Sequence, residues 1–477
     1  MATNKYLKAG IWYTVGNYLL KGLTFLTLPI FARLLTKADF GQYSIFTTYE
    51  MMLYVIIGFA MHSSYKNAYY RYRADTDADR SEYNSYVSTT LLLLLVNTGL
   101  WLIASILFNE QLGRILGLDG RCVPLLVIFS GSSALITSFN TDVSIRYEYG
   151  PFLAVSFINA LGSIGLSLFL ILCVFDNQRY FGRIIGCTVP YAIIASILFL
   201  YFLRKARPRD IKEKLRWGLK YSLPIIPHGL SQIVLNQFDR IMINRFLGSV
   251  LAGVYSFSYN LYMIIAVTAT SVDNVWAPWL YERLGEKNYK AIKKVSSMYI
   301  LFLLSFCIII SLASPELVHF FGGAKYKDSV YCVIPIVTSG FFAFAYNIPA
   351  SVEYYHEKTV GIAAATFCAA VINIVLNYVF IKKYGYIAAA YTTLFTYFLY
   401  FYLHLFLSYK IENRMLFNIK VIVTASCVVL VNNMLAIKLV DALIVRMIII
   451  LAVVILLLAY EERKMGLIKR RLIKQSA

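Results

Sequence analysis

The feature that most constrains this chain is a series of fourteen long apolar segments that runs through its 477 residues. A helix of about 20 apolar residues crosses the roughly 30 Å hydrocarbon core of a bilayer. Hydrophobic residues make up 59% of the chain and charged residues 15%, with a mean hydropathy of +0.64. We therefore predict an all-α integral membrane protein with about 14 transmembrane helices. The predicted spans are 9–33, 40–61, 84–108, 122–144, 151–175, 182–203, 218–244, 250–273, 295–314, 329–352, 359–381, 385–407, 418–437 and 441–460.

A short motif occurs twice, each time between the first and second spans of one half of the chain. The pattern Arg-x-Leu, five residues, then Gly-x-Tyr-Ser covers residues 33–44 and again residues 245–256. A single copy could arise by chance, but two copies at equivalent points of similar hydropathy patterns are poorly explained by chance. Duplicated helix bundles are typical of transporters that move two halves around a central site.

The repeat divides the chain into two halves and a remainder. We predict an N-terminal six-helix lobe over residues 1–210, a C-terminal six-helix lobe over 211–410, and two additional transmembrane helices with a basic tail over 411–477. The basic segment 204–216 is the only stretch that resembles an interdomain linker. Because each half holds an even number of spans, the two lobes are expected to be related by a pseudo-twofold axis along the membrane normal.

The basic residues indicate orientation rather than a nucleic-acid partner. The formal net charge is +20, and the Lys and Arg residues concentrate at 204–220, 283–294 and 463–474. Cytoplasmic loops carry such an excess, so we predict that both termini are cytoplasmic and that these charges contact membrane lipids. No soluble face interleaves basic and base-stacking aromatic residues, which argues against nucleic-acid binding. No cleavable signal peptide is predicted.

The seventh predicted span carries the clearest candidate site. His228, Gln232, Asn236 and Arg240 recur every four residues and form a polar stripe on one helical face, with Asp239 beside it. Such a stripe must face protein or water rather than lipid. We favour the lining of a water-filled cavity, because arginine is always charged. The alternative is interhelical hydrogen bonding within a dry bundle.

The first predicted span carries a weaker version of this pattern. Asn17 and Lys21 share one face, and Lys21 falls near mid-depth. Lys21 could line the same cavity, or it could form a structural ion pair with Glu50 of the second span. Arg33 and Arg245, the arginines of the repeated motif, lie near the outer ends of their spans. A role in substrate binding and simple snorkelling to the interface remain equally open for both.

Signatures of catalysis and of metal binding are missing from the sequence. It contains no phosphate-binding glycine–lysine loop, no nucleophile elbow and no paired-histidine zinc motif. The seven cysteines lie in or at apolar segments without a ligand spacing. We therefore predict no enzymatic activity, no catalytic residues, no metal site and no cofactor. An integral-membrane polysaccharide polymerase or glycosyltransferase remains the alternative from a different class.

Two stretches carry a resemblance to a known family. The first is Asp239-Arg-Ile-Met-Ile, followed by Leu247-Gly248 and Gly253-Val-Tyr255-Ser256. The second is the run 373–381 (NIVLNYVFI), followed by 384–390 (YGYIAAA). Both resemble polysaccharide repeat-unit flippases of the Wzx type, which serve O-antigen, lipopolysaccharide and capsule synthesis. Relatives in the same superfamily include the MurJ-like lipid II flippases and the MATE exporters.

The resemblance implies two six-helix lobes around a cationic cavity in the bacterial cytoplasmic membrane. It also implies that an undecaprenyl-diphosphate-linked oligosaccharide is the cargo, with a polysaccharide polymerase and a chain-length regulator as partner proteins. Lys21 and Arg240 would neutralise the diphosphate, and Arg33 and Arg245 would meet it toward the outside. A MATE-like small-molecule exporter is the nearer alternative. An exporter of organic cations would need net acidic groups at depth, whereas Glu50 and Asp239 each have a basic neighbour in the sequence pattern.

Overall fold

The computed structural model describes residues 2–72 and 80–475, and within these ranges the regular secondary structure is helical. A helix occupies each of the fourteen positions at which the sequence predicts a span. This confirms the predicted fold class. The helices group into two compact units, each formed by two separate stretches of the chain.

Unit 1 comprises Met1–Ser256 and Thr366–Ala389. It holds the first ten α-helices together with the start of α11, most of α16 and the start of α17. The helices that lie wholly in unit 1 are α1 (Ala2–Leu34), α2 (Lys37–Ile57), η1 (Met61–Ser64), α3 (Tyr65–Arg71), α4 (Ser81–Leu107), α5 (Asn109–Leu116), α6 (Cys122–Ile145), α7 (Tyr149–Cys173), α8 (Arg179–Lys205), α9 (Ile211–Ser222) and α10 (Ile225–Leu247).

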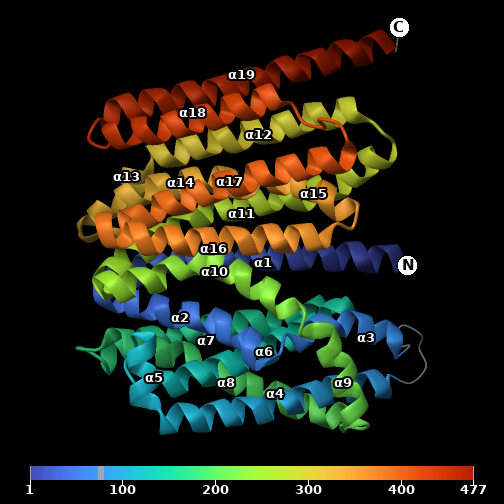
Figure 1. Ribbon diagram of the computed structural model, residues 1–477, viewed down its shortest axis with the longest axis vertical. Helices are drawn as coiled ribbons and strands as arrows, with labels where there is room; N and C mark the ends of the chain where they lie inside the picture. Colours follow the sequence, from blue (N-terminus) through green and yellow to red (C-terminus); the bar gives the residue numbers. More distant parts are fainter. Residues whose placement is uncertain (1, 73–79, 476–477) are drawn as a thin grey trace. The chain divides into compact units, whose positions relative to one another are not determined.

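Unit 2 comprises Phe257–Ala365 and Ala390–Ala477. Within it, α18 and α19 pack along α12 (Figure 1). The helices that lie partly or wholly in unit 2 are α11 (Ser249–Gly285), α12 (Tyr289–Leu312), α13 (Ser314–Gly322), η2 (Ala324–Ser329), α14 (Val330–Ala345), α15 (Asn347–Tyr355), α16 (Thr359–Tyr384), α17 (Ile387–Glu412), α18 (Ile419–Lys438) and α19 (Leu443–Gln475).

Fewer helices are apolar enough to cross a membrane than the fourteen that the sequence predicts. Among the described residues, 10 helices pass by length and hydropathy, or 11 if the bent pair of α2 with η1 and α3 counts as one span. The helices that fall short are α10, α17 and α19. The polar stripe lowers the hydropathy of α10, and α19 is apolar only over Leu443–Ala459. A helix that faces protein or water needs less apolar surface than one that faces lipid.

The basic segment that the sequence marks as a linker folds in part into α9, an amphipathic helix that packs within unit 1. Lys214 is buried, with its Nζ 2.8 Å from Glu82 Oε2 and 2.9 Å from Ser85 Oγ. Gly218 lies against Tyr86, where a Cβ would approach the phenol oxygen to 2.5 Å. These contacts fix α9 on α4 and keep this part of the connection from acting as a free linker.

Candidate functional site

The polar stripe lies on α10, and all four of its members are half-buried. Gln232 Nε2 donates to Thr366 Oγ1 on α16 at 3.3 Å, and Asn236 Nδ2 donates to the carbonyl of Gln232 at 2.8 Å. Some side-chain atoms of the stripe are nonetheless fully enclosed, since His228 Nδ1 is buried without a hydrogen-bond partner. The stripe thus combines contacts to a neighbouring helix with partly accessible polar surface.

Asp239, beside the stripe, is fully buried and serves as an acceptor. The Tyr255 hydroxyl of α11 donates to Oδ2, and the backbone N–H of Arg240 donates to Oδ1 at 2.8 Å. A buried carboxylate needs such donors, because an uncompensated buried charge is costly. The aspartate therefore joins α10 to the second copy of the repeated motif, and its carboxylate does not face an open surface.

On α1, Lys21 is half-buried and Asn17 is exposed. Lys21 and Glu50 do not form the ion pair that one interpretation of the sequence requires. Instead, the Glu50 side chain is buried, with Ser133 of α6 and Tyr54 near its carboxyl group. The structural alternative for Lys21 is thus wrong as stated, because Glu50 faces α6 rather than α1. Lys21 and Arg240 both belong to unit 1, on α1 and α10.

The two arginines of the repeated motif are both exposed at the ends of their helices. Arg245 Nη1 donates to the carbonyl of Arg114 at 3.2 Å, so its side chain caps a carbonyl in the last turn of α5. Neither position is buried in the way that a dedicated ligand-binding arginine would be. The choice between snorkelling and substrate contact stays open for this pair.

The repeated motif forms a reciprocal contact between its own two copies. A Cβ on Gly41 would lie 2.0 Å from the carbonyl oxygen of Ser249, and a Cβ on Gly253 would lie 1.9 Å from the carbonyl oxygen of Lys37. The residue offset that carries Gly41 onto Gly253 also carries Lys37 onto Ser249. The contact is therefore self-complementary, as at a twofold axis. Only glycine allows the backbones of α2 and α11 to approach this closely.

The turns that lead into the two copies are built differently. In the first copy, the Thr36 hydroxyl accepts from the N–H of Asp39 at 3.1 Å, and the Asp39 carboxylate accepts from the N–H of Thr36 at 3.0 Å. This capping box starts α2. In the second copy, Gly248 takes the equivalent place and ends α10 with φ at 90°, a conformation that favours glycine.

Sequence reasoning missed Arg183 on α8. Its guanidinium carbon lies 3.6 Å from the centroid of the Phe31 ring and 4.9 Å from that of Tyr43, and Nη1 donates to Ser167 Oγ at 2.9 Å. Two aromatic faces and the Ser167 hydroxyl thus surround this cation. An arginine within an apolar span was the available signal.

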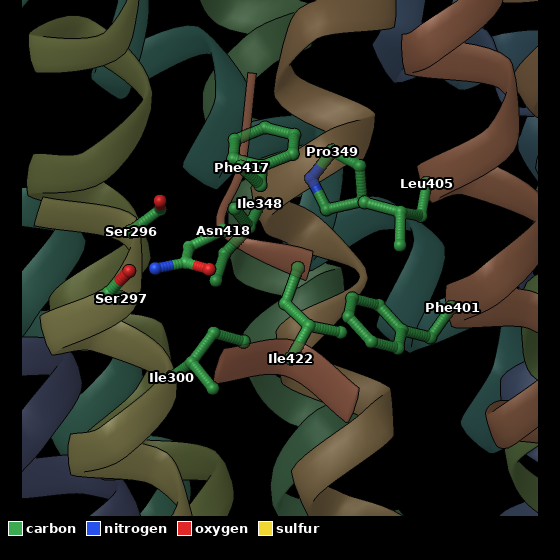
Figure 2. Close-up of a pocket in the computed structure, with 10 residues that line it drawn as sticks. All are labelled: Ser296, Ser297, Ile300, Ile348, Pro349, Phe401, Leu405, Phe417, Asn418 and Ile422. Atoms are coloured by element: carbon green, nitrogen blue, oxygen red, sulfur yellow. The ribbon is translucent and has the colours of Figure 1, made fainter. Parts of the chain in front are cut away.

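Two of the cavities among the described residues of unit 2 differ in size and character. The larger is an apolar space of about 700 Å³ bounded by residues of α11, α12 and α19. Its walls include Val275, Trp276, Trp279, Phe302, Val453 and Leu456. The smaller is a crevice between α12, α15, α17 and the start of α18 that has no room for a water molecule (Figure 2). Within the described parts of the chain, no three His, Cys, Asp or Glu residues gather as metal ligands.

Comparison with known proteins decides the family. The family model for "Polysaccharide biosynthesis protein" matches residues 6–283, which is more than half of the chain. The chain belongs to this family. A second model, MatE, matches residues 224–379. The resemblance to polysaccharide flippases related to MATE proteins is thereby confirmed.

Individual relatives are distant in sequence but similar over nearly their whole length. "Lsg locus putative protein 1" of Haemophilus influenzae is 20% identical over 382 residues, which are 78% of this chain and 90% of the relative. The structure of the lipid II flippase MurJ in an inward closed conformation superimposes with a TM-score of 0.75 at 15% identity, covering 95% of this chain and 99% of MurJ. An inward-facing MATE multidrug transporter gives 0.60 at 15% identity, covering 89% and 95%. These structures share the fold of this multi-pass membrane protein.

Proposed function

We propose that this protein is a flippase that moves undecaprenyl-diphosphate-linked oligosaccharide repeat units across the bacterial cytoplasmic membrane by alternating access. Family membership supports polysaccharide synthesis as the context. The observation that carries the cargo assignment is the half-buried polar face of α10, which ends in Arg240 and belongs to the same unit as Lys21. A diphosphate is an anion, and cations at depth in a wet cavity would offset its charge.

The arrangement of acidic side chains favours an anionic cargo over an organic cation. An exporter of cations would present carboxylates to its cavity. Here Asp239 is sealed under Tyr255, and Glu50 is buried against α6. Asn, Gln and His side chains of the stripe would contact sugar hydroxyls loosely. In this proposal they hold an oligosaccharide without selecting one sugar.

The apolar cavity of unit 2 has the character that a polyprenyl chain requires. Its walls are aliphatic and aromatic, and its volume of about 700 Å³ could hold several isoprene units. Transfer of each buried CH₂ out of water contributes about 0.8 kcal/mol, although a tail that leaves lipid for this cavity gains much less. We propose that it receives part of the lipid tail while the headgroup crosses.

A complementation experiment tests the proposal. In a host whose surface polysaccharide depends on this gene, Arg240→Ala and Lys21→Ala should abolish surface polysaccharide and cause the lipid-linked oligosaccharide to accumulate. Arg240→Lys should retain part of the activity, because it keeps the charge and loses only the bidentate geometry. Arg207→Ala and Lys290→Ala, at exposed positions, are the matched controls and should behave as wild type.

Protein abundance separates the possible outcomes. If Arg240→Ala and Lys21→Ala both support normal surface polysaccharide, the cavity assignment is wrong. If both variants fail to accumulate while their conservative replacements accumulate and function, these residues are structural.

The predicted orientation can be tested in parallel. A cysteine at exposed Lys212 should resist an impermeant reagent from outside, whereas one at exposed Asp441 should react.

A further inference from the structure

Helix α15 is held to its neighbours in unit 2 by polar side chains at both of its ends. It follows α14 after a break at Tyr346 and is only 9 residues long. At its start, Asn347 Nδ2 donates to Asp273 Oδ2 of α11 at 2.6 Å. At its end, two His–Glu pairs tie it to α17. A short helix beyond a break depends on such contacts, since its own backbone hydrogen bonds stabilise it little.

The two His–Glu pairs carry their partners in opposite order. Glu353 of α15 pairs with His404 of α17, Oε1 to Nδ1, at 2.5 Å. His356, which follows α15, pairs with Glu412, the last residue of α17, Nε2 to Oε1, at 2.7 Å. The inner pair is sealed, with side-chain exposures of 0% and 1%, whereas the outer pair shows 35% and 12%. The same chemistry is thus present once in a dry setting and once near solvent.

The described residues that surround the inner pair are mainly tyrosines. The His404 ring lies 4.4 Å from that of Tyr400 and 5.5 Å from that of Tyr346, measured between centroids. Tyr354 interacts electrostatically with Glu353, and Asp273 lies beyond Tyr346. Among the described residues, His404 is the only basic side chain paired with Glu353. Its Nε2 is buried without a hydrogen-bond partner.

These surroundings make the charge of the inner pair depend on one proton. A neutral imidazole carries one N–H proton. When the pair holds one further proton, shared between the carboxylate and the imidazole, its total charge is zero. Without that proton, a carboxylate beside a neutral imidazole leaves a buried negative charge. Within the described residues no lysine or arginine forms an ion pair with Glu353, and tyrosines are neutral near physiological pH. An uncompensated charge in a dry site must be hydrated or relieved by movement.

We propose that Glu353 and His404 form a binding site for a single proton, and that release of this proton loosens α15 from α17. The proton sits between carboxylate and imidazole, and its departure leaves the negative charge that the closed packing cannot solvate. The outer pair, His356 with Glu412, lies near water and does not act as a switch. This site belongs to unit 2 and is independent of the polar face proposed for the cargo.

A distance measurement across the two helices tests this site without any cargo. Nitroxide labels go on cysteines at exposed Glu357 and Lys410, after the exposed Cys173, Cys368 and Cys427 have been replaced by serine. Electron–electron resonance on the full chain in lipid nanodiscs then reports the separation between about pH 5 and pH 8, the range in which imidazole titrates. We expect the wild-type distance to shift to longer values as the pH rises.

The variants make opposite predictions for the two pairs. Glu353→Gln removes the carboxylate, so no buried negative charge forms when His404 is neutral, and the distance should stay short as the pH rises. His356→Gln, the matched control in the outer pair, should keep the wild-type pH response. If the single variant His404→Gln fails to accumulate, the double variant Glu353→His with His404→Glu restores the pair. This double variant should restore the pH response of the distance. A wild-type distance that does not change with pH, or a Glu353→Gln variant that responds as wild type does, would overturn the proposal.

Discussion

The two copies of the repeated motif share a backbone contact but differ in the charge that their tyrosines meet. Tyr43 of the first copy lies beside the Arg183 guanidinium, with its hydroxyl 3.3 Å from Cys187 Sγ. Tyr255 of the second copy donates to the buried carboxylate of Asp239. The glycines keep one geometry in both halves, while the tyrosines have acquired opposite partners. The backbone contact at the two glycines is thus the same in both copies, whereas the partners of the two tyrosines differ.

The polar face itself is not duplicated. The offset that superimposes the motifs places Arg240 over Leu28 and Ile233 over Lys21. Each half therefore contributes its cation on nearly the same helical face, but about two turns, or roughly 10 Å, apart along the helix. A cargo with one anionic group and a long asymmetric body needs no symmetric site. In the proposed function, the duplicated contact would serve the conformational cycle and the unduplicated residues would bind the cargo.

The largest effect on stability is expected at the shared glycine contact. Gly41→Ala and Gly253→Ala each place a Cβ about 2 Å from a carbonyl oxygen of the other helix, and backbone cannot yield as a side chain can. Overpacking of this kind costs about 1–3 kcal/mol or more, and the two variants should be equally affected because the contact is reciprocal. Thermal unfolding of the purified protein measures this cost.

A helical glycine in open space provides the control for these variants. Gly22→Ala on α1 meets no atom within 4 Å and should leave stability unchanged or raise it by up to about 1 kcal/mol. Strongly unequal losses of stability in Gly41→Ala and Gly253→Ala would show that the contact between α2 and α11 is not reciprocal. A pair of neutral effects would show that the helices do not stay in this contact.

A smaller effect should separate the two tyrosines. Tyr255→Phe removes a donor from the buried Asp239 carboxylate and should cost about 1–3 kcal/mol of unfolding free energy. Tyr43→Phe keeps the ring beside Arg183 and loses only a weak contact to sulfur, so it should cost less than about 1 kcal/mol. Chemical denaturation of both variants measures the difference. Equal costs would mean that the partners of the two tyrosines do not differ as the structure indicates.

The smallest effect concerns the loop between α5 and α6, in the first half. Arg121 Nη2 lies 2.7 Å from Asp119 Oδ2, and this hydrogen bond lowers the pKa of the Asp119 carboxyl to about 2. A lowered folded-state pKa contributes stability above the unfolded value of about 4, and the contribution is lost as the pH falls toward 2. Unfolding of wild type and Asp119→Asn should therefore differ slightly at neutral pH and converge in acid. A difference that persists below pH 2 would contradict the assignment.

The fold followed from the sequence more completely than the site did. Long apolar segments leave few alternatives to membrane helices, so all fourteen positions hold a helix. The stripe on α10 was visible because four-residue spacing places side chains on one helical face. The partners of Glu50, Asp239 and His404 were not predictable, since they come from helices distant in sequence. Single-helix periodicity carries no information on which neighbouring helix a side chain meets.

Charge counting along the sequence misled in one place for the same reason. Lys21 and Glu50 are opposite charges on consecutive spans, which made an ion pair a reasonable expectation. The rotation of α2 turns the glutamate toward α6 instead. Arg183 was overlooked because its partners are aromatic rings from α1 and α2. Cation–π partners leave no complementary charge to find in a sequence.

Direct observation of lipid-linked sugar crossing a membrane tests the proposed flippase activity. Lipid-linked oligosaccharide, extracted from a host that lacks this gene, would be incorporated into vesicles with or without the purified protein. An impermeant sugar-modifying reagent then follows the fraction that reaches the outer leaflet. We expect rapid exposure with wild-type protein, partial exposure with Arg240→Lys, and with Arg240→Ala no more exposure than in protein-free vesicles. Exposure by folded wild-type protein no faster than in protein-free vesicles, or full activity of Arg240→Ala, would contradict this expectation.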